Sequence, residues 1–447
     1  MPNWPAERDP APRHAWAWTP WWVLACVALW PLPGPAEALL ALGALAVLAQ
    51  LAVALARGRT LPLDRRAAVL AAAVFAAYWL PEALSAPDAL DRGRALKEAV
   101  ADLRYLPFLC GVVIALHDPA GRRTVFVGLA LVAAAWTVDA LLQAVAGASP
   151  LFLGLDALRR ATSGEPFCPA AEMLAPDRIN GVFGACNPKL GLVLASLSPL
   201  ALAAAGRRGA LAWSAAALAL GAAILLAGAR AAWLAYALVL AFSGWRALGG
   251  RRLLAFAAAG ALALAVLYLA SPPVQQRLAR TAAVLHGDAG LDDALSGRVR
   301  IWQGAACMAA AHPVNGVGVR GFRLAWEDCD PAPGQAPAWG GGGAYHAHQL
   351  LLELLSETGT VGLLLWLAGT WAVWRSWRGA DAAARARARP ALLALAVTVF
   401  PLNTHLAFYS TFWGGLTLLL AGLYAGALHG RPGAGDGDAA SYRAGRS

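Results

Sequence analysis

Long apolar runs, each of about 20 residues, constrain the fold of this chain more than any other feature, because such a run crosses roughly 30 Å of hydrocarbon as an α-helix. The runs lack the alternation of apolar and polar residues that an outer-membrane barrel requires. The composition agrees, since 59% of the residues are hydrophobic and only 14% are charged. The sequence therefore predicts an all-α polytopic membrane protein.

About twelve membrane-spanning helices are expected. They cover residues 16–32, 37–56, 67–86, 99–117, 124–146, 188–205, 210–228, 230–247, 253–270, 350–374, 390–408 and 411–429. If both ends of the chain are cytoplasmic, every short inside connection carries arginine, as the positive-inside rule requires; Arg57, Arg59, Arg65 and Arg66 are one example. The arginines that give the chain its net charge of +10 are therefore expected to orient its helices in the membrane. Nucleic acid is not expected as a partner.

This topology divides the chain into five segments. Residues 1–15 and 430–447 are cytoplasmic tails, residues 16–270 hold the first nine helices, residues 271–349 form a large outside loop, and residues 350–429 hold the last three helices. Shorter outside loops are expected at residues 87–98 and 148–187.

The large outside loop is expected to be partly helical. Apolar residues recur in it at helical spacing, namely Leu295, Val299, Trp302, Ala306 and Met308. They predict an amphipathic helix near residues 293–312 that lies along the membrane–water interface.

Cysteines in the outside segments indicate a disulfide. Cys168, Cys186 and Cys329 lie in these segments, while Cys307 lies on the expected interfacial helix. An oxidising compartment permits Cys168 to pair with Cys186, or either of them to pair with Cys329. The sequence leaves this choice open.

Cationic residues gather at the outer ends of the expected helices. Arg230 opens one helix, and Lys189 follows Asn187-Pro188, which is expected to form the N-cap and first turn of another. Arg178 and Arg298 lie in the two long outside segments. Helix N-termini attract anions, so an arginine there has the wrong sign for helix stability unless an anion is bound. Because arginine also suits bidentate phosphate contact, these positions predict an anion site.

Two histidines, His346 and His348, stand where the large outside loop meets the apolar run at residue 350. Because they are two residues apart, they cannot share one face of a helix, and no HExxH or CxxC motif supports a metal site. A helix N-terminus disfavours the protonated form of a nearby histidine, and a neutral imidazole is a competent general base. The alternative is an interfacial histidine with no chemical task.

His348-Gln349, followed by nine residues, Gly359, two residues and Gly362, resembles the signature of the O-antigen ligase and polymerase family. Three segments around the large outside loop are also similar to this family's pattern, namely residues 296–302, which end at Trp302, residues 313–318 and residues 357–359. Earlier in the chain, the similar segments are Arg178 to Phe183 followed by Asn187-Pro188, and Arg230 with Leu234. A weaker similarity covers Asp139, Gln143 and Gly147. Asn403 and His405 are similar to a segment near the active site of O-antigen ligases, which favours ligase over polymerase.

The resemblance implies a multi-pass glycosyltransferase of the Gram-negative inner membrane, with a glycosyltransferase C-like fold and an active site that faces the periplasm. Such an enzyme transfers polymerised O-antigen from undecaprenyl diphosphate to a sugar hydroxyl of lipid A-core, with no metal or other cofactor and with inversion. His348 would be the base, and Arg230 and Arg298, joined by Arg178 and Lys189, would hold the diphosphate. Supporting roles would fall to Gln349, Gly359, Gly362, Trp302, Asn187, Asn403, His405 and His346.

Other functions remain open at this point. An O-antigen polymerase or a protein O-oligosaccharyltransferase would use the same donor with another acceptor. A transporter of lipid-linked sugar would use charges inside the membrane, such as Asp139 and Arg104. A covalent intermediate is left open by four carboxylates, which are Glu327, Asp328, Asp330 and Glu353.

Overall fold

The protein is a bundle of helices in its computed structural model, which describes residues 13–169, 173, 178–270, 275, 295, 297–337, 339, 343–404 and 406–433. Every regular element in these ranges is a helix. The first half contains η1 (Arg13–Trp16), α1 (Thr19–Ala28), α2 (Pro33–Ala56), α3 (Arg65–Ser85), η2 (Ala86–Asp88), α4 (Arg92–Asp102), α5 (Tyr105–His117), α6 (Pro119–Ala146), α7 (Pro150–Ser163) and η4 (Gly181–Phe183). The second half contains α8 (Leu190–Gly206), α9 (Ala210–Leu226), α10 (Arg230–Leu248), α11 (Gly250–Ala270), α14 (Arg298–Ala311), α15 (Phe322–Cys329), α16 (Leu350–Gly379), α17 (Ala382–Thr398) and α18 (Thr411–His429).

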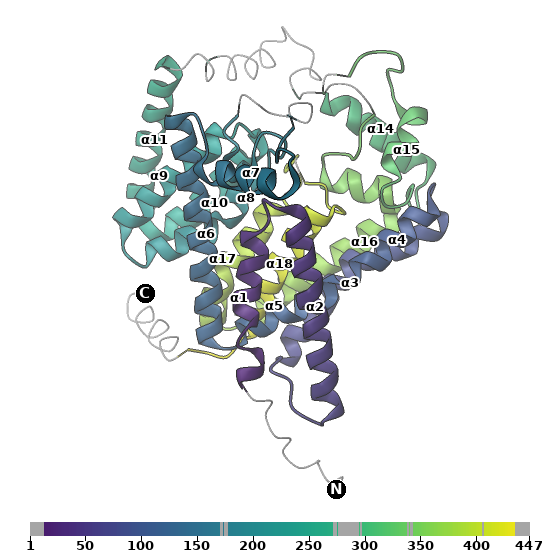
Figure 1. Ribbon diagram of the computed structural model, residues 1–447, viewed down its shortest axis with the longest axis horizontal. Coiled ribbons are helices and arrows are strands. Elements are labelled where there is room, and N and C mark those ends of the chain that lie inside the picture. Colours follow the sequence, from purple (N-terminus) through teal and green to yellow (C-terminus); the bar gives the residue numbers. More distant parts are fainter. Residues whose placement is uncertain are drawn as a thin grey trace.

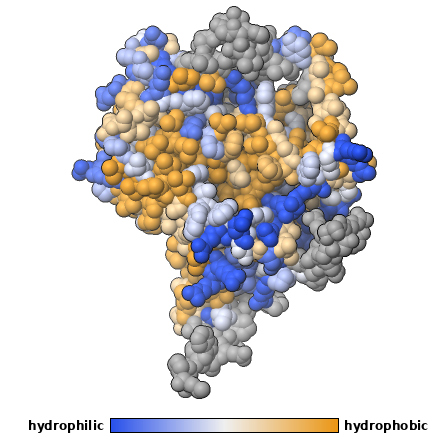
Figure 2. All heavy atoms as spheres, turned by 180° about the vertical axis from the view of Figure 1, so that it is seen from behind, coloured by the Kyte–Doolittle hydropathy of each residue, from blue (hydrophilic) through white to orange (hydrophobic). Residues whose placement is uncertain are grey.

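The prediction of a polytopic helical membrane protein is confirmed. Seven candidate spans among the described residues are long and apolar enough to cross a membrane, and α1, α8 and α9 are shorter apolar helices. Leucines of α2, such as Leu42, Leu45 and Leu48, are exposed on its outer side, as expected for side chains that face lipid. Figure 2 shows a broad hydrophobic surface over the back of the bundle. The number of crossings, twelve, stays a prediction.

The centre of the bundle is α18, which is buried along almost its whole length and packs against α17, α5 and α3 (Figure 1). Small residues allow this close approach, because a Cβ atom at Gly422 would overlap Val112 and one at Gly426 would overlap Leu116. Close backbone contact through small residues is typical of helix packing in membranes, where burial from lipid supplies little driving force.

Several predicted boundaries were wrong. The expected helix at residues 99–117 is two helices, α4 and α5, and α4 occupies most of the expected loop at 87–98. The expected loop at 148–187 contains α7. The expected helix at 390–408 ends at Thr398, because Pro401 lacks a backbone N–H and disfavours the helical conformation of the residue before it.

The interfacial helix predicted near residues 293–312 exists as α14, but its buried face differs from the predicted one. Ile301, Ala305 and Met308 are buried, whereas Ala306 is exposed. The buried face packs on Val317, Phe322 and Trp326 in a second hydrophobic core. Protein therefore covers this apolar face. We call α14, α15 and the segments that join them the outer lobe; Figure 1 shows it at the end of the bundle opposite the connection between α2 and α3.

Two disulfides are present, Cys168–Cys186 and Cys307–Cys329. The first is one of the pairings left open by the sequence. The second was missed, because Cys307 was left out of the pairing when it was assigned to a helix at the membrane surface. This bond joins α14 to the end of α15 and cross-links the outer lobe.

Candidate active site

His348 lies directly before α16, in a backbone conformation that side chains rarely adopt. Its φ is 53°, and only one other non-glycine residue in the described chain, Arg320, has a positive φ. Such strain costs of order 1–3 kcal/mol and persists where the surroundings impose it, which is commonly at functional sites. The Gln349 side chain caps α16 by accepting a hydrogen bond from the Leu352 N–H at 2.6 Å. His348 is thereby held at the N-terminal end of α16.

One hydrogen bond defines the tautomer of the His348 ring. Nδ1 lies 3.2 Å from the Thr404 carbonyl oxygen. A carbonyl only accepts hydrogen bonds, so Nδ1 carries the proton and Nε2 has the free lone pair. Burial of the ring lowers the pKa of His348 to about 4; the positive charge of Arg298 acts in the same direction and the Thr404 contact opposes it. His348 is therefore neutral at neutral pH.

The loop between α17 and α18 supplies this carbonyl, and Asn403 holds the loop in place. The buried Asn403 side chain donates to the Thr398 carbonyl at 2.8 Å, and its backbone N–H donates to Phe400 at 2.8 Å. Asn403 therefore fixes the turn that presents Thr404 to His348. His405, the other residue singled out in this segment, lies outside the described residues.

Three of the four predicted diphosphate ligands lie together. Arg298 is the first residue of α14 and Arg230 is the first residue of α10. Burial, together with the positive charges of Arg230 and Arg178, lowers the pKa of Arg298 to about 10. The Arg298 Nη1 atom donates to the Leu295 carbonyl at 3.2 Å, whereas its buried Nε atom has no partner among the described residues. The three arginines form one cationic group, and Arg298 within it also acts on His348.

The segment that carries Arg178 is anchored to α6. The side-chain oxygen of Gln143 accepts the backbone N–H groups of Asn180 and Gly181 at 3.2 and 2.7 Å. Asp139, one turn earlier, accepts the Ser149 hydroxyl at 2.8 Å. Asp139 and Gln143 therefore order the segments around the arginine group, and Asp139 is engaged locally instead of lining a path through the membrane.

Gly359 explains how the outer lobe is joined to α16. Gly359 has φ 64° and ψ −162° and interrupts α16, and the chain from Pro313 to Gly318, which we call the strap, enters the break. Backbone hydrogen bonds join the two segments, from Thr360 to Pro313 (2.9 Å), Val361 to Val314 (3.2 Å), Val317 to Ser356 (2.8 Å) and Gly318 to Glu357 (3.0 Å). A Cβ atom at Gly359 would overlap the Val314 carbonyl, and one at Gly362 would overlap Thr358. Gly359 is therefore needed for the junction with the strap, whereas Gly362 makes room for the Thr358 side chain within α16.

Two further predicted residues have different outcomes. Trp302, one turn after Arg298, is half-buried, and its indole N–H finds no acceptor among the described residues. Asn187 was expected to cap a helix that starts at Pro188, and this was wrong. The helix, α8, begins at Leu190, and Lys189 occupies its N-cap position without a side-chain cap. The Asn187 carbonyl instead accepts the Lys189 N–H at 2.7 Å, in a turn before the helix.

The other charged residues considered above have structural partners or face solvent. Arg300 makes a bidentate contact with Asp330 at 2.7 and 2.6 Å, which lowers the pKa of Asp330. Glu353 accepts the Tyr409 N–H at 3.4 Å, and Glu327 and Asp328 are exposed. Arg104 pairs with Glu37 at 3.2 Å. Within the ranges that the structure describes, no group of three or more His, Cys, Asp and Glu side chains could hold a metal ion.

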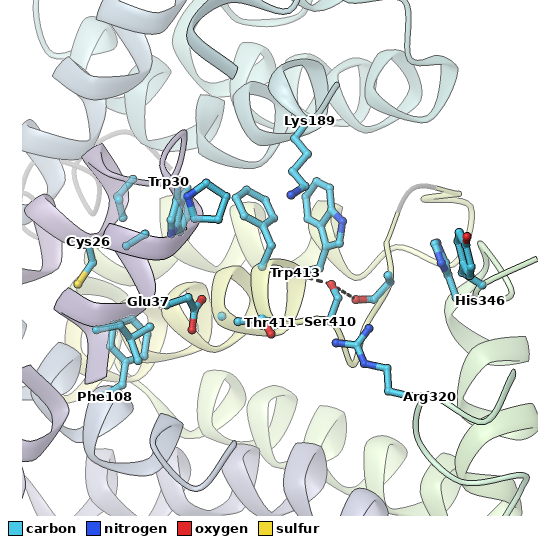
Figure 3. Close-up of a pocket in the computed structure, with 18 of the residues that line it drawn as sticks. Cys26, Trp30, Glu37, Phe108, Lys189, Arg320, His346, Ser410, Thr411 and Trp413 are labelled. Atoms are coloured by element: carbon cyan, nitrogen blue, oxygen red, sulfur yellow. Dashed lines mark hydrogen bonds between the residues drawn. The ribbon is translucent and has the colours of Figure 1, made fainter. Parts of the chain in front are cut away.

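A cavity of about 580 Å³ lies beside the histidine pair. His346 lines it, and its ring centroid is 3.9 Å from that of His348. Lys189, Arg320 and Arg323 also line the cavity, whereas Arg178, Arg230, Arg298 and His348 do not. Figure 3 shows Arg320 and His346 toward one end, Cys26, Trp30 and Phe108 toward the other, and Lys189 reaching in between them. Lys189, predicted as a diphosphate ligand, is thus placed with a second cationic group.

Arg320 and Arg323 were missed in the sequence. They stand in Gly318-Val319-Arg320-Gly321-Phe322-Arg323, where glycines interrupt any helical periodicity. Arg320 lies before α15 with a positive φ, so the rule that residues three apart share a helix face does not apply to this pair. The local sequence therefore held no clear signal for it.

The comparisons with known proteins give one match. A family model described as O-antigen ligase matches residues 215–367, a range that includes Arg230, Arg298, His348, Gly359 and Gly362. No curated protein matches the chain. The similarity to the O-antigen ligase family therefore covers residues 215–367.

Proposed function

We propose that this protein is an O-antigen ligase, which transfers polymerised O-antigen from undecaprenyl diphosphate to a sugar hydroxyl of lipid A-core. One observation carries the proposal: a neutral histidine with a free Nε2 atom lies near Arg298, which forms one cationic group with Arg230 and Arg178. Diphosphate as a leaving group needs its developing negative charge stabilised, and the acceptor hydroxyl needs a base. The arginines and His348 supply these two functions.

The proposed reaction is a direct displacement. His348 Nε2 takes the proton of the acceptor hydroxyl as its oxygen attacks the anomeric carbon. The bond from that carbon to the diphosphate oxygen breaks, and the diphosphate leaves with the electron pair beside Arg230 and Arg298. The anomeric centre is inverted. The engagement of Asp330 and Glu353 with other partners supports displacement over a covalent intermediate.

The proposed site faces the periplasm from the inner membrane of a Gram-negative cell. The arginine-rich connection between α2 and α3 supports this orientation, because it lies at the opposite end of the bundle from the outer lobe and positive connections face the cytoplasm (Figure 1).

Product analysis with the purified full-length chain tests the function. Carrier-linked glycan would be offered with lipid A-core, with a second carrier-linked repeat unit, or with a pilin-like protein, each in the presence of a chelator. We expect a product only with lipid A-core, and we expect chelation to leave the rate unchanged. Product from carrier-linked repeats alone would identify a polymerase, and glycosylated protein would identify a protein O-oligosaccharyltransferase.

Replacement of Arg230 or Arg298 by alanine is expected to weaken donor binding about 10- to 100-fold, because a hydrogen bond to a charged group contributes about 1.5–3 kcal/mol. Binding of undecaprenyl diphosphate to the reconstituted protein measures the effect. Arg159→Ala, which removes an exposed arginine of α7, serves as the matched control and should bind as the wild type does. Full donor affinity in Arg298→Ala would contradict the assigned role.

The dependence on pH tests the link between Arg298 and His348. The positive charge of Arg298 lowers the pKa of His348, so Arg298→Gln should raise that pKa. His348 must be neutral to act as the base, and the rate therefore falls as the pH drops through its pKa. We expect the acid limb of kcat/KM for the donor, which reports the free enzyme, to move to higher pH in Arg298→Gln and to stay in place in Arg159→Gln. If the acid limb of Arg298→Gln stays in place or moves to lower pH, the charge of Arg298 does not set the pKa of the catalytic base.

A further inference from the structure

The cavity beside His346 has two chemically different ends. Cys26, Val27 and Leu40 of α1 and α2 give one end an apolar lining. Lys189, Arg320 and Arg323 give the cavity an excess of positive charge. The carboxylate of Glu37 also lines it, but this group pairs with Arg104 at 3.2 Å. The cavity therefore fits an amphiphile with an anionic headgroup, and its volume of about 580 Å³ is within the usual range of ligand sites.

The surroundings of Arg323 and Lys189 disfavour their charged forms. Burial lowers the pKa of Arg323, and the positive charges of Arg94 and Arg320 act in the same direction, while Glu357 opposes them. Its guanidinium lies 5.0 Å from the centroid of the Tyr345 ring, which orients it beside the histidines. Burial also lowers the pKa of Lys189 to about 8, and its ammonium lies 4.2 Å from the centroid of the Phe412 ring. A bound anion would offset these costs.

Arg320 provides an independent indication. It shares with His348 the left-handed backbone conformation that no other non-glycine residue in the described chain adopts. Backbone strain of this kind marks positions where a side chain must point in a required direction. The Glu98 carboxylate lies 3.6 Å from Arg320 and helps to hold it. The two strained residues therefore belong to neighbouring parts of one site, joined by the contact between His346 and His348.

We propose that this cavity binds the acceptor as a phosphorylated amphiphile, with Arg320, Arg323 and Lys189 recognising the phosphate and the apolar end receiving part of the lipid. The assignment rests on the proposed function. The acceptor is favoured over the donor because Arg178, Arg230 and Arg298 form a separate group, of which Arg298 acts on His348, and none of them lines the cavity. The acceptor hydroxyl would then approach His348 from the side of His346.

Equilibrium binding to the full-length chain in nanodiscs tests the proposal, with monophosphorylated lipid A and its dephosphorylated form as probes. The variants are Arg323→Gln and Lys189→Gln, with Arg323→Lys as the conservative change. Arg378→Gln at the far end of α16, where the guanidinium lies over Trp374, is the matched control. The same proteins are titrated with undecaprenyl diphosphate.

We expect Arg323→Gln and Lys189→Gln each to weaken binding of the phosphorylated probe about tenfold, while Arg323→Lys restores most of it. The dephosphorylated probe should bind weakly and equally to all variants, and binding of undecaprenyl diphosphate should not change. An equal loss with both lipid A probes, or a loss confined to undecaprenyl diphosphate, would overturn the assignment. Phosphate-dependent binding without any glycan transfer to lipid A-core would reject the ligase proposal and leave the cavity as an anionic amphiphile site.

Discussion

His348→Ala is expected to reduce glycan transfer by about 10²–10⁴-fold, because removing a general base loses the proton transfer that it provides in the transition state. Donor binding should be retained, since Arg230 and Arg298 remain. Transfer from carrier-linked glycan, measured alongside binding of undecaprenyl diphosphate and thermal unfolding, separates loss of chemistry from loss of fold.

A second variant distinguishes proton transfer from positioning. His348→Asn keeps a side chain that tolerates the left-handed conformation and can donate to the Thr404 carbonyl, but asparagine cannot take up a proton. We expect it to be as inactive as His348→Ala. His346→Ala, two residues away, should lose much less than either, because the Thr404 carbonyl, which fixes the tautomer of His348, remains in this variant. Near-normal transfer by His348→Asn would show that the residue only positions the loop.

The sequence was sufficient to predict the long apolar helices but not the places where they are interrupted. Apolar runs of spanning length located these helices, because the bilayer imposes both length and composition on such segments, whereas the shorter and less apolar α4, α7 and α15 were missed. The break in α16 depends on hydrogen bonds between residues such as Pro313 and Thr360, which are far apart in the chain. The early end of α17, by contrast, has a local signal in Pro401, but an apolar run of spanning length obscured it.

For the candidate site, local signals located single residues and long-range packing decided their groups. Arg230 at a helix start and His348 before α16 were both predicted from local sequence. Lys189 lines the same cavity as Arg320, whereas Arg298 does not line it. This grouping depends on long-range packing, which no spacing in the sequence encodes. The Thr404 carbonyl was also beyond prediction, because any residue type provides a backbone acceptor.

The junction at Gly359 leads to the second large effect. Gly359→Ala is expected to destabilise the protein strongly, by about 1–3 kcal/mol for a side chain in a backbone conformation that only glycine adopts readily and by about 1–3 kcal/mol more for forcing a methyl group against the Val314 carbonyl. These losses are a large part of a typical folding free energy of about 5–15 kcal/mol. Thermal unfolding of the purified protein in detergent measures the destabilisation.

The same substitution should also damage the site, because the strap that enters the break at Gly359 joins the outer lobe, which carries Arg298, to α16, which follows His348. Gly379→Ala is the matched control in the same helix, since a Cβ atom there meets nothing within 4 Å. We expect Gly379→Ala to behave as the wild type does, and Gly359→Ala to lose transfer activity even at temperatures where it remains folded. Equal stability and activity of the two variants would mean that the strap does not fix the position of Arg298 relative to His348.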